Sequence, residues 1–150
     1  RSRNKPMLLQ RKYGFVLGSL LSLFVFRITA QFAQWLHPFE FLPPFQTWHS
    51  AVMPYPLLLC CQIVIAAAFL RVIICLYRGN YAPLRRRGCV WLVPSIIYFS
   101  VMAFRLVASL TYAEDDSWMC ATLPAFFHII LSSFLLIYGF FNYRYGTYGG

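Results

Sequence analysis

The sequence predicts an all-α integral membrane protein, a four-helix bundle with both termini on the same, basic side of the bilayer. Of its 150 residues, 60% are hydrophobic and only 11% are charged, whereas a soluble domain carries about 25% charged residues. The apolar residues form four runs, each near or above the roughly 20 residues that cross about 30 Å of hydrocarbon. Basic and acidic residues also fall into alternate connecting segments, as expected of a multi-pass membrane protein.

The four expected transmembrane helices follow in order along the chain, at residues 13–36, 55–77, 89–112 and 121–141. Their connections are too short to fold separately, so we expect a single membrane domain over residues 1–150. The chain begins with Arg1 rather than Met, so we expect a processed product or a fragment.

The first outer loop, residues 37–54, combines several prolines with many aromatic side chains. Proline excludes a long helix there, and irregular backbone cannot lie in contact with lipid tails. We therefore expect the loop to lie flat on the outer surface, with a short helix between Pro44 and Pro54. It would act as a lid over the bundle or as a docking segment for a neighbouring subunit.

The charge distribution predicts the orientation of the helices. Lys and Arg occur in the N-terminal tail, the middle loop and the C-terminal tail, whereas all the acidic residues lie in the first and third loops: Glu40, Glu114, Asp115 and Asp116. Cytoplasmic loops are enriched in Lys and Arg, so both termini and the middle loop are predicted on the cytoplasm-like side. The protein would be a multi-pass component of a bacterial inner membrane or an organellar inner membrane.

The basic residues at the inner ends of the helices also predict partners. The formal net charge is +9, which in a soluble protein would suggest nucleic acid. Here the basic residues flank apolar runs, so we expect anionic lipids and no nucleic acid as ligands. The predicted contacts to lipid headgroups are Lys12, Arg85, Arg86 and Arg87.

A polar layer is predicted in the outer half of the bundle, because each expected helix carries one strongly polar residue there: Arg27, Gln62, Arg105 and His128. At about 1.5 Å per residue, these positions lie roughly 10–14 Å below the outer boundary. Gln31 shares a helical face with Arg27, and a stripe on the third helix includes Tyr98, Met102, Arg105 and Ser109. The inner half is expected to be smooth, with Gly14, Gly18 and Ser22 suited to close helix contact.

The two arginines of this layer need compensation, because an Arg at mid-bilayer depth costs about 2.5–3.5 kcal/mol on insertion scales. No Asp or Glu lies within any span. Three roles remain open for Arg27 and Arg105: snorkelling or joining helices, binding an anionic or polar ligand, and pairing with a partner subunit.

Motifs for catalysis, metals and cofactors are absent from the sequence. His37, His49 and Glu40 match no compact metal-ligand spacing, so no metal site is predicted. Only His128 lies within a span, so no cofactor is predicted and a haem bound through His128 and a loop histidine is kept as an alternative. There is no catalytic triad pattern and no intramembrane carboxylate. No catalytic residue is predicted, and the chain is not expected to be an enzyme.

Two functions follow from these observations. The first is a non-catalytic accessory or structural subunit of a larger membrane protein complex, such as a bioenergetic one, with other membrane subunits as partners. The second is a ligand-binding four-helix membrane bundle or small membrane enzyme. Its cavity would be the polar layer, with Arg27 and Arg105 binding an anion and His128 acting as acid and base.

Overall fold

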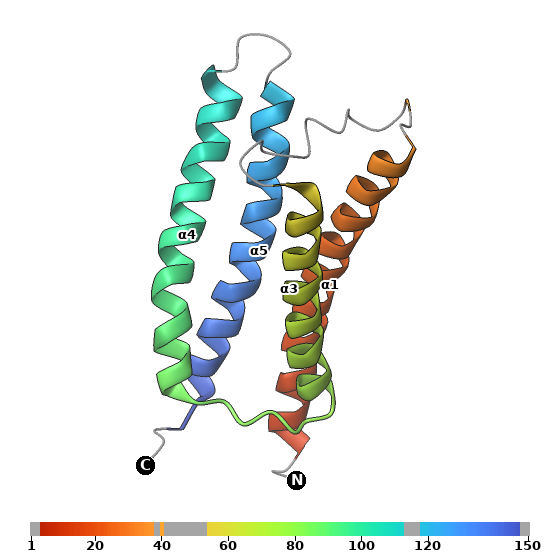
Figure 1. Cartoon of the computed structure of the whole chain (residues 1–150). Helices are drawn as coiled ribbons and strands as arrows, with labels where there is room; N and C mark the ends of the chain where they lie inside the picture. The colour runs from red at the N-terminus through yellow and green to blue at the C-terminus, as the bar shows by residue number, and fades with distance from the viewer. Residues whose placement is uncertain (1–3, 38–39, 41–53, 113–117, 148–150) are drawn as a thin grey trace.

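The computed structural model describes residues 4–37, 40, 54–112 and 118–147. Within these ranges the chain is all-helical, apart from one isolated β-bridge, and has four helices long and apolar enough to span a membrane. They are α1 (Asn4–Leu36), α3 (Tyr55–Tyr77), α4 (Arg85–Tyr112) and α5 (Trp118–Tyr145) (Figure 1). The predicted class of multi-pass helical membrane protein is therefore confirmed. The predicted short helix between Pro44 and Pro54 lies outside the described residues.

Proline and glycine mark both ends of α3. Pro54 precedes the helix in an extended conformation, with φ −58° and ψ 135°, and a second proline lies in the first turn, where a missing N–H is tolerated. At the other end, Gly79 adopts φ 69°. The N–H groups of Gly79 and Asn80 donate to the carbonyls of Leu76 and Cys75 at 3.1 and 3.2 Å, which is the Schellman arrangement that ends a helix.

The other helices extend beyond the apolar runs at the basic end. α1 begins at Asn4 rather than at residue 13, α4 begins at Arg85 rather than at 89, and α5 ends at Tyr145 rather than at 141. Hydropathy marks only the part of a helix that lies in hydrocarbon. Lys and Arg are good helix formers whose long side chains reach the interface, so the helices continue through it.

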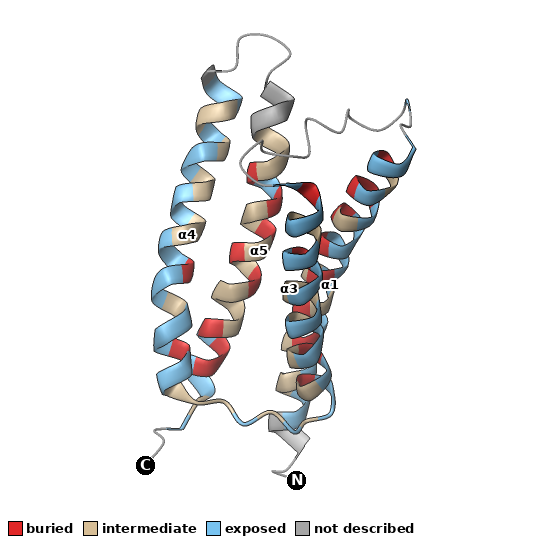
Figure 2. Ribbon diagram, in the orientation of Figure 1, coloured by how far each residue is buried: buried red, intermediate tan, exposed pale blue. Residues whose placement is uncertain are grey.

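The helices form two pairs that meet along α1 and α5. α4 packs along α5, α3 packs along α1, and both termini lie at the same end of the molecule (Figure 1). The main core cluster joins side chains of α1, α3 and α5: Leu17, Leu21, Phe24, Ile73, Leu76, Phe134 and Phe141. Burial is concentrated on these three helices, whereas α4 is mostly exposed (Figure 2).

Glycines permit the close approach of α4 and α5. A Cβ atom at Gly88 would lie 2.2 Å from the backbone nitrogen of Tyr143, and one at Gly139 would lie 3.0 Å from the nitrogen of Leu92. Small residues at such crossings let helix backbones approach. The predicted close-contact series on α1 is wrong at Gly18, because no atom of the described residues lies within 4 Å of a Cβ there. Small-residue spacing alone does not show which side faces another helix.

The inner half is not smooth, contrary to the prediction. Asn142 is fully buried, and its Oδ1 accepts hydrogen bonds from the Tyr81 hydroxyl at 3.0 Å and the Leu84 N–H at 3.3 Å. Its Nδ2 donates to the Tyr138 carbonyl at 2.9 Å, and the hydroxyls of Tyr81 and Tyr138 lie 2.7 Å apart. Gln10 of α1 donates to the Tyr81 carbonyl at 3.1 Å. We call Gln10, Tyr81, Tyr138 and Asn142 the inner polar cluster; it joins α1, the middle loop and α5.

Candidate binding site

A cavity of ≈ 130 Å³ lies between α1, α3 and α5, in the half of the bundle away from the termini that is predicted to be the outer half. Three of the four residues predicted to form the polar layer line it: Arg27, Gln62 and His128. The rest of the lining is Cys61 and a mainly apolar set: Phe24, Leu58, Ile65, Pro124, Phe127 and Leu131. Counting depth along each helix therefore identified the three polar residues of one cavity.

α1 positions Arg27 on a buried polar stripe. Arg27, Gln31 and Gln34 follow one another at helical spacing and are all buried, with Arg27 only 7% exposed. The predicted shared face of Arg27 and Gln31 is thus confirmed, although Gln31 does not line the cavity. The Arg27 guanidinium carbon lies 5.0 Å from the centre of the Phe127 ring of α5, within cation–π range. This contact holds a permanent positive charge at the cavity wall.

Gln62 lies on the inward face of α3. It is 4% exposed and shares that face with Tyr55, Ile73 and Leu76, the other buried residues of the helix. Among the described residues, no group donates a hydrogen bond to the Gln62 Oε1 atom. An unsatisfied buried acceptor costs about 1–3 kcal/mol. The wall of the cavity therefore includes a buried acceptor that has no donor among the described residues.

His128 is held by a tyrosine that the sequence did not identify as part of the site. Its Nδ1 atom lies 2.5 Å from the hydroxyl of Tyr98 on α4. When Tyr98 donates this hydrogen bond, the ring proton resides on Nε2, and the ring can donate from that atom. Tyr98 is part of the predicted α4 stripe. Its position deep within a span, rather than at an interface where tyrosine is usual, was the signal in the sequence that could have assigned it to the site.

Arg105 is the member of the predicted layer that the structure places apart. Its side chain is exposed and does not line the cavity. Elsewhere on the predicted α4 stripe, Ser109 accepts a hydrogen bond from Thr122 of α5 at 3.1 Å. Because α4 packs only along α5 among the described helices, its inward face is too narrow to bury the arginine.

The basic residues at the inner end divide into two kinds. Lys12, Arg86 and Arg87 are exposed, as lipid headgroup contacts would have to be. Arg85 instead packs its guanidinium over the Tyr143 ring, 4.7 Å from the ring centre, and donates to the Tyr143 hydroxyl at 3.3 Å. Arg85, one of the four predicted headgroup contacts, therefore also contributes to the packing of α4 against α5. Headgroup binding itself remains a prediction.

The possible metal and cofactor ligands are few. The described residues contain no group of three or more His, Cys, Asp or Glu side chains that could hold a metal ion. Cys60, Cys61, Cys75 and Cys89 are free thiols. Of the two loop histidines, His37 directly follows α1, and His49 lies outside the described residues. The alternative of a haem bound through His128 therefore remains a prediction.

Comparisons of the chain with protein-family models, with curated proteins and with solved structures return no match. The fold and the site define a class, a multi-pass helical membrane protein with a polar cavity inside its spans. Arguments about function therefore rest on the chemistry of that cavity. Its wall presents the guanidinium of Arg27, the imidazole of His128 and the amide of Gln62, and the rest of the lining is mainly apolar.

Proposed function

We propose that this protein is a ligand-binding membrane bundle whose cavity receives a small polar molecule or group. The observation that carries the proposal is the convergence of Arg27, Gln62 and His128, from three helices, on one cavity within the spans. Ionisable residues inside a membrane are expensive and usually mark a functional site. Pockets at the centre of helix bundles are also a common place for ligands.

The energetic balance supports the same function. A bundle that only had to fold would be more stable with a leucine at position 62, because the Gln62 Oε1 atom is buried without a donor among the described residues. Retaining the amide next to a buried arginine makes sense when a bound group completes the hydrogen bonding. Tyr98 also holds the His128 ring in place before any ligand arrives, which lowers the entropic cost of binding.

A second function, an accessory subunit of a larger membrane complex, is supported by a different observation. α4 packs only along α5 among the described helices and exposes a long apolar face. Its most exposed large side chain is Phe104, at 77%, and the face also includes Val93, Ile97, Val101 and Val107. Lipid or a neighbouring helix would cover such a face. This function and ligand binding are compatible.

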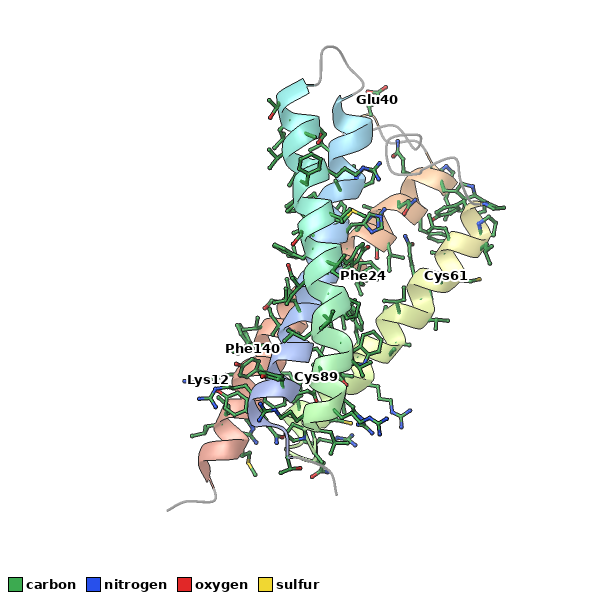
Figure 3. The ribbon with its side chains drawn as sticks, turned by 90° about the vertical axis from the view of Figure 1, so that its left-hand side faces the viewer. Lys12, Phe24, Glu40, Cys61, Cys89 and Phe140 are labelled. Atoms are coloured by element: carbon green, nitrogen blue, oxygen red, sulfur yellow. The ribbon has the colours of Figure 1, made fainter. Side chains whose placement is uncertain are left out.

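We infer from charge that both termini face a cytoplasm-like compartment, in a bacterial or organellar inner membrane. The termini lie at one end of the molecule (Figure 1). Lys12 lies near that end and Glu40 near the opposite one (Figure 3). This asymmetry agrees with the excess of Lys and Arg in cytoplasmic loops.

The test of ligand binding is whether small water-soluble molecules reach the cavity. Ile65 lines the cavity, whereas its neighbour Val64 does not and is 67% exposed on the outer surface of α3. In a background with all five cysteines replaced by alanine, Ile65→Cys and Val64→Cys give two thiols at nearly equal depth. In phosphatidylcholine nanodiscs, a charged thiosulfonate should modify position 65 much faster than position 64. Equally slow modification of both thiols would contradict the proposed function.

A further inference from the structure

We propose that the cavity binds an oxyanion that also carries a hydrogen-bond donor, such as hydrogen phosphate or an α-hydroxycarboxylate. The same group can arrive as a free anion or as the headgroup of an amphiphile. The inference rests on the proposed function and names its ligand class. Three properties of the cavity lead to it: the sign of its charge, the arrangement of donors and acceptors, and its volume.

The described lining of the cavity carries positive charge and no carboxylate. Arg27 lines the cavity, and the sequence places no Asp or Glu in any of the four spans, because all four acidic residues lie at positions 40 and 114–116. In a medium of low polarity, electrostatic attraction is stronger than in water. An anion is therefore the charge type that this cavity would attract, and a cation would be repelled.

The hydrogen-bonding groups narrow the class of anion. Arg27 presents a planar fork of N–H donors suited to carboxylate and phosphate, and His128 can donate from Nε2 when Tyr98 donates to Nδ1. Both groups satisfy anionic oxygens. Gln62, in contrast, has an Oε1 acceptor with no donor among the described residues. A plain carboxylate leaves that atom unsatisfied, whereas an anion with an O–H group supplies its missing donor once the amide turns its Oε1 atom toward the cavity.

The volume limits the size of the bound group. The cavity measures ≈ 130 Å³, and a water molecule occupies about 30 Å³ of the liquid. The cavity therefore holds a group equivalent to a few water molecules, such as phosphate or glycolate. An acyl chain would not fit beside it. For an amphiphile, only the headgroup would enter, and the tail would have to lie among the lipids.

The experiment measures how well defined probes protect the thiol of the Ile65→Cys variant from N-ethylmaleimide, an uncharged reagent. The full-length protein is held in phosphatidylcholine nanodiscs. The soluble probes are phosphate, glycolate, acetate and choline, and the amphiphilic pair is dodecyl phosphate and dodecanol. Phosphate and glycolate should protect the thiol, acetate should bind about tenfold more weakly because it lacks the donor for Gln62, and choline should not protect.

Variants assign the binding to the cavity. Arg27→Gln should weaken phosphate binding at least about tenfold, and Arg27→Lys should retain part of it because the charge is kept. Arg71→Gln is the matched control, since Arg71 is an exposed arginine of α3 that does not line the cavity. It should leave binding unchanged. Size-exclusion profiles show whether each variant is folded.

The outcomes separate the two proposals. Protection by phosphate or glycolate supports a free anion, and protection by dodecyl phosphate alone supports a headgroup. A reactive thiol that choline protects and no anion protects overturns the oxyanion inference while the ligand-binding function stands. A reactive thiol that no probe protects also overturns the inference. A thiol at position 65 that does not react even without a probe contradicts both proposals.

Discussion

Replacing Gln62 with leucine is expected to stabilise the ligand-free protein, although polar-to-apolar changes at functional positions usually look harmful. Gln62 is 4% exposed, its Oε1 atom has no donor among the described residues, and its surroundings include the apolar side chains of Leu58 and Ile65. Removing an unsatisfied buried acceptor should recover about 1–3 kcal/mol. Strain from the branched side chain should subtract less than about 1.5 kcal/mol. The free energy of unfolding should therefore rise by roughly 0.5–2 kcal/mol.

The assay is reversible unfolding by SDS in mixed micelles, followed by circular dichroism at 222 nm. Gln10→Leu is the matched control, because it removes a buried Oε1 atom that likewise has no donor among the described residues, and also the hydrogen bond from the Gln10 amide to the Tyr81 carbonyl. Losing that bond should make Gln10→Leu less stabilising than Gln62→Leu by about 0.5–1.5 kcal/mol. The reasoning would be refuted if Gln62→Leu lowered the free energy of unfolding by more than about 1 kcal/mol, since Gln62 would then contribute to stability.

Four further substitutions test the packing and the buried hydrogen bonds. A Cβ atom at Gly88 would lie 2.2 Å from a backbone nitrogen of α5, so Gly88→Ala should lower the free energy of unfolding by about 1–3 kcal/mol. Gly18→Ala, where no described atom lies within 4 Å of the added Cβ, should be neutral or slightly stabilising. Equal effects of the two substitutions in SDS titration would contradict this account of the α4–α5 contact. Asn142→Leu removes three hydrogen bonds and should lower the free energy of unfolding by at least about 2 kcal/mol. A loss below about 0.5 kcal/mol would argue against a stabilising role of the inner polar cluster. Tyr98→Phe should cost about 0.5–1.5 kcal/mol and shift the ¹⁵N resonance of His128 Nδ1, and an unchanged resonance would show that the hydrogen bond is not formed.

The predictable part of the fold is the part that hydropathy and helix geometry determine. The ends of α3 at Tyr55 and Tyr77 match the predicted range because prolines and Gly79 bound it. Depth below the outer boundary is likewise fixed by the helical rise. That calculation correctly grouped Arg27, Gln62 and His128 around one cavity.

The unpredicted part depends on which helices touch. Depth along an axis does not determine the direction in which a side chain points, so Arg105, at the same predicted depth, is exposed on α4. Asn142 was missed because it lies just beyond the end of the predicted run at residue 141, and because its partners include Tyr81 and Leu84 of the middle loop. Gly88 was missed because its importance comes from the backbone that it approaches.

The central claim is that Arg27 makes a cavity within the spans positive and reachable from water. Its most direct test compares the rates at which an anionic and a cationic methanethiosulfonate modify the Ile65→Cys thiol, with and without Arg27→Gln. A unit charge about 10 Å away contributes about 1.7 kcal/mol at an effective dielectric constant of about 20. The anionic reagent should therefore react at least about tenfold faster, and Arg27→Gln should abolish most of that preference. Equal rates for the two reagents, or a preference that survives the loss of Arg27, would contradict the claim.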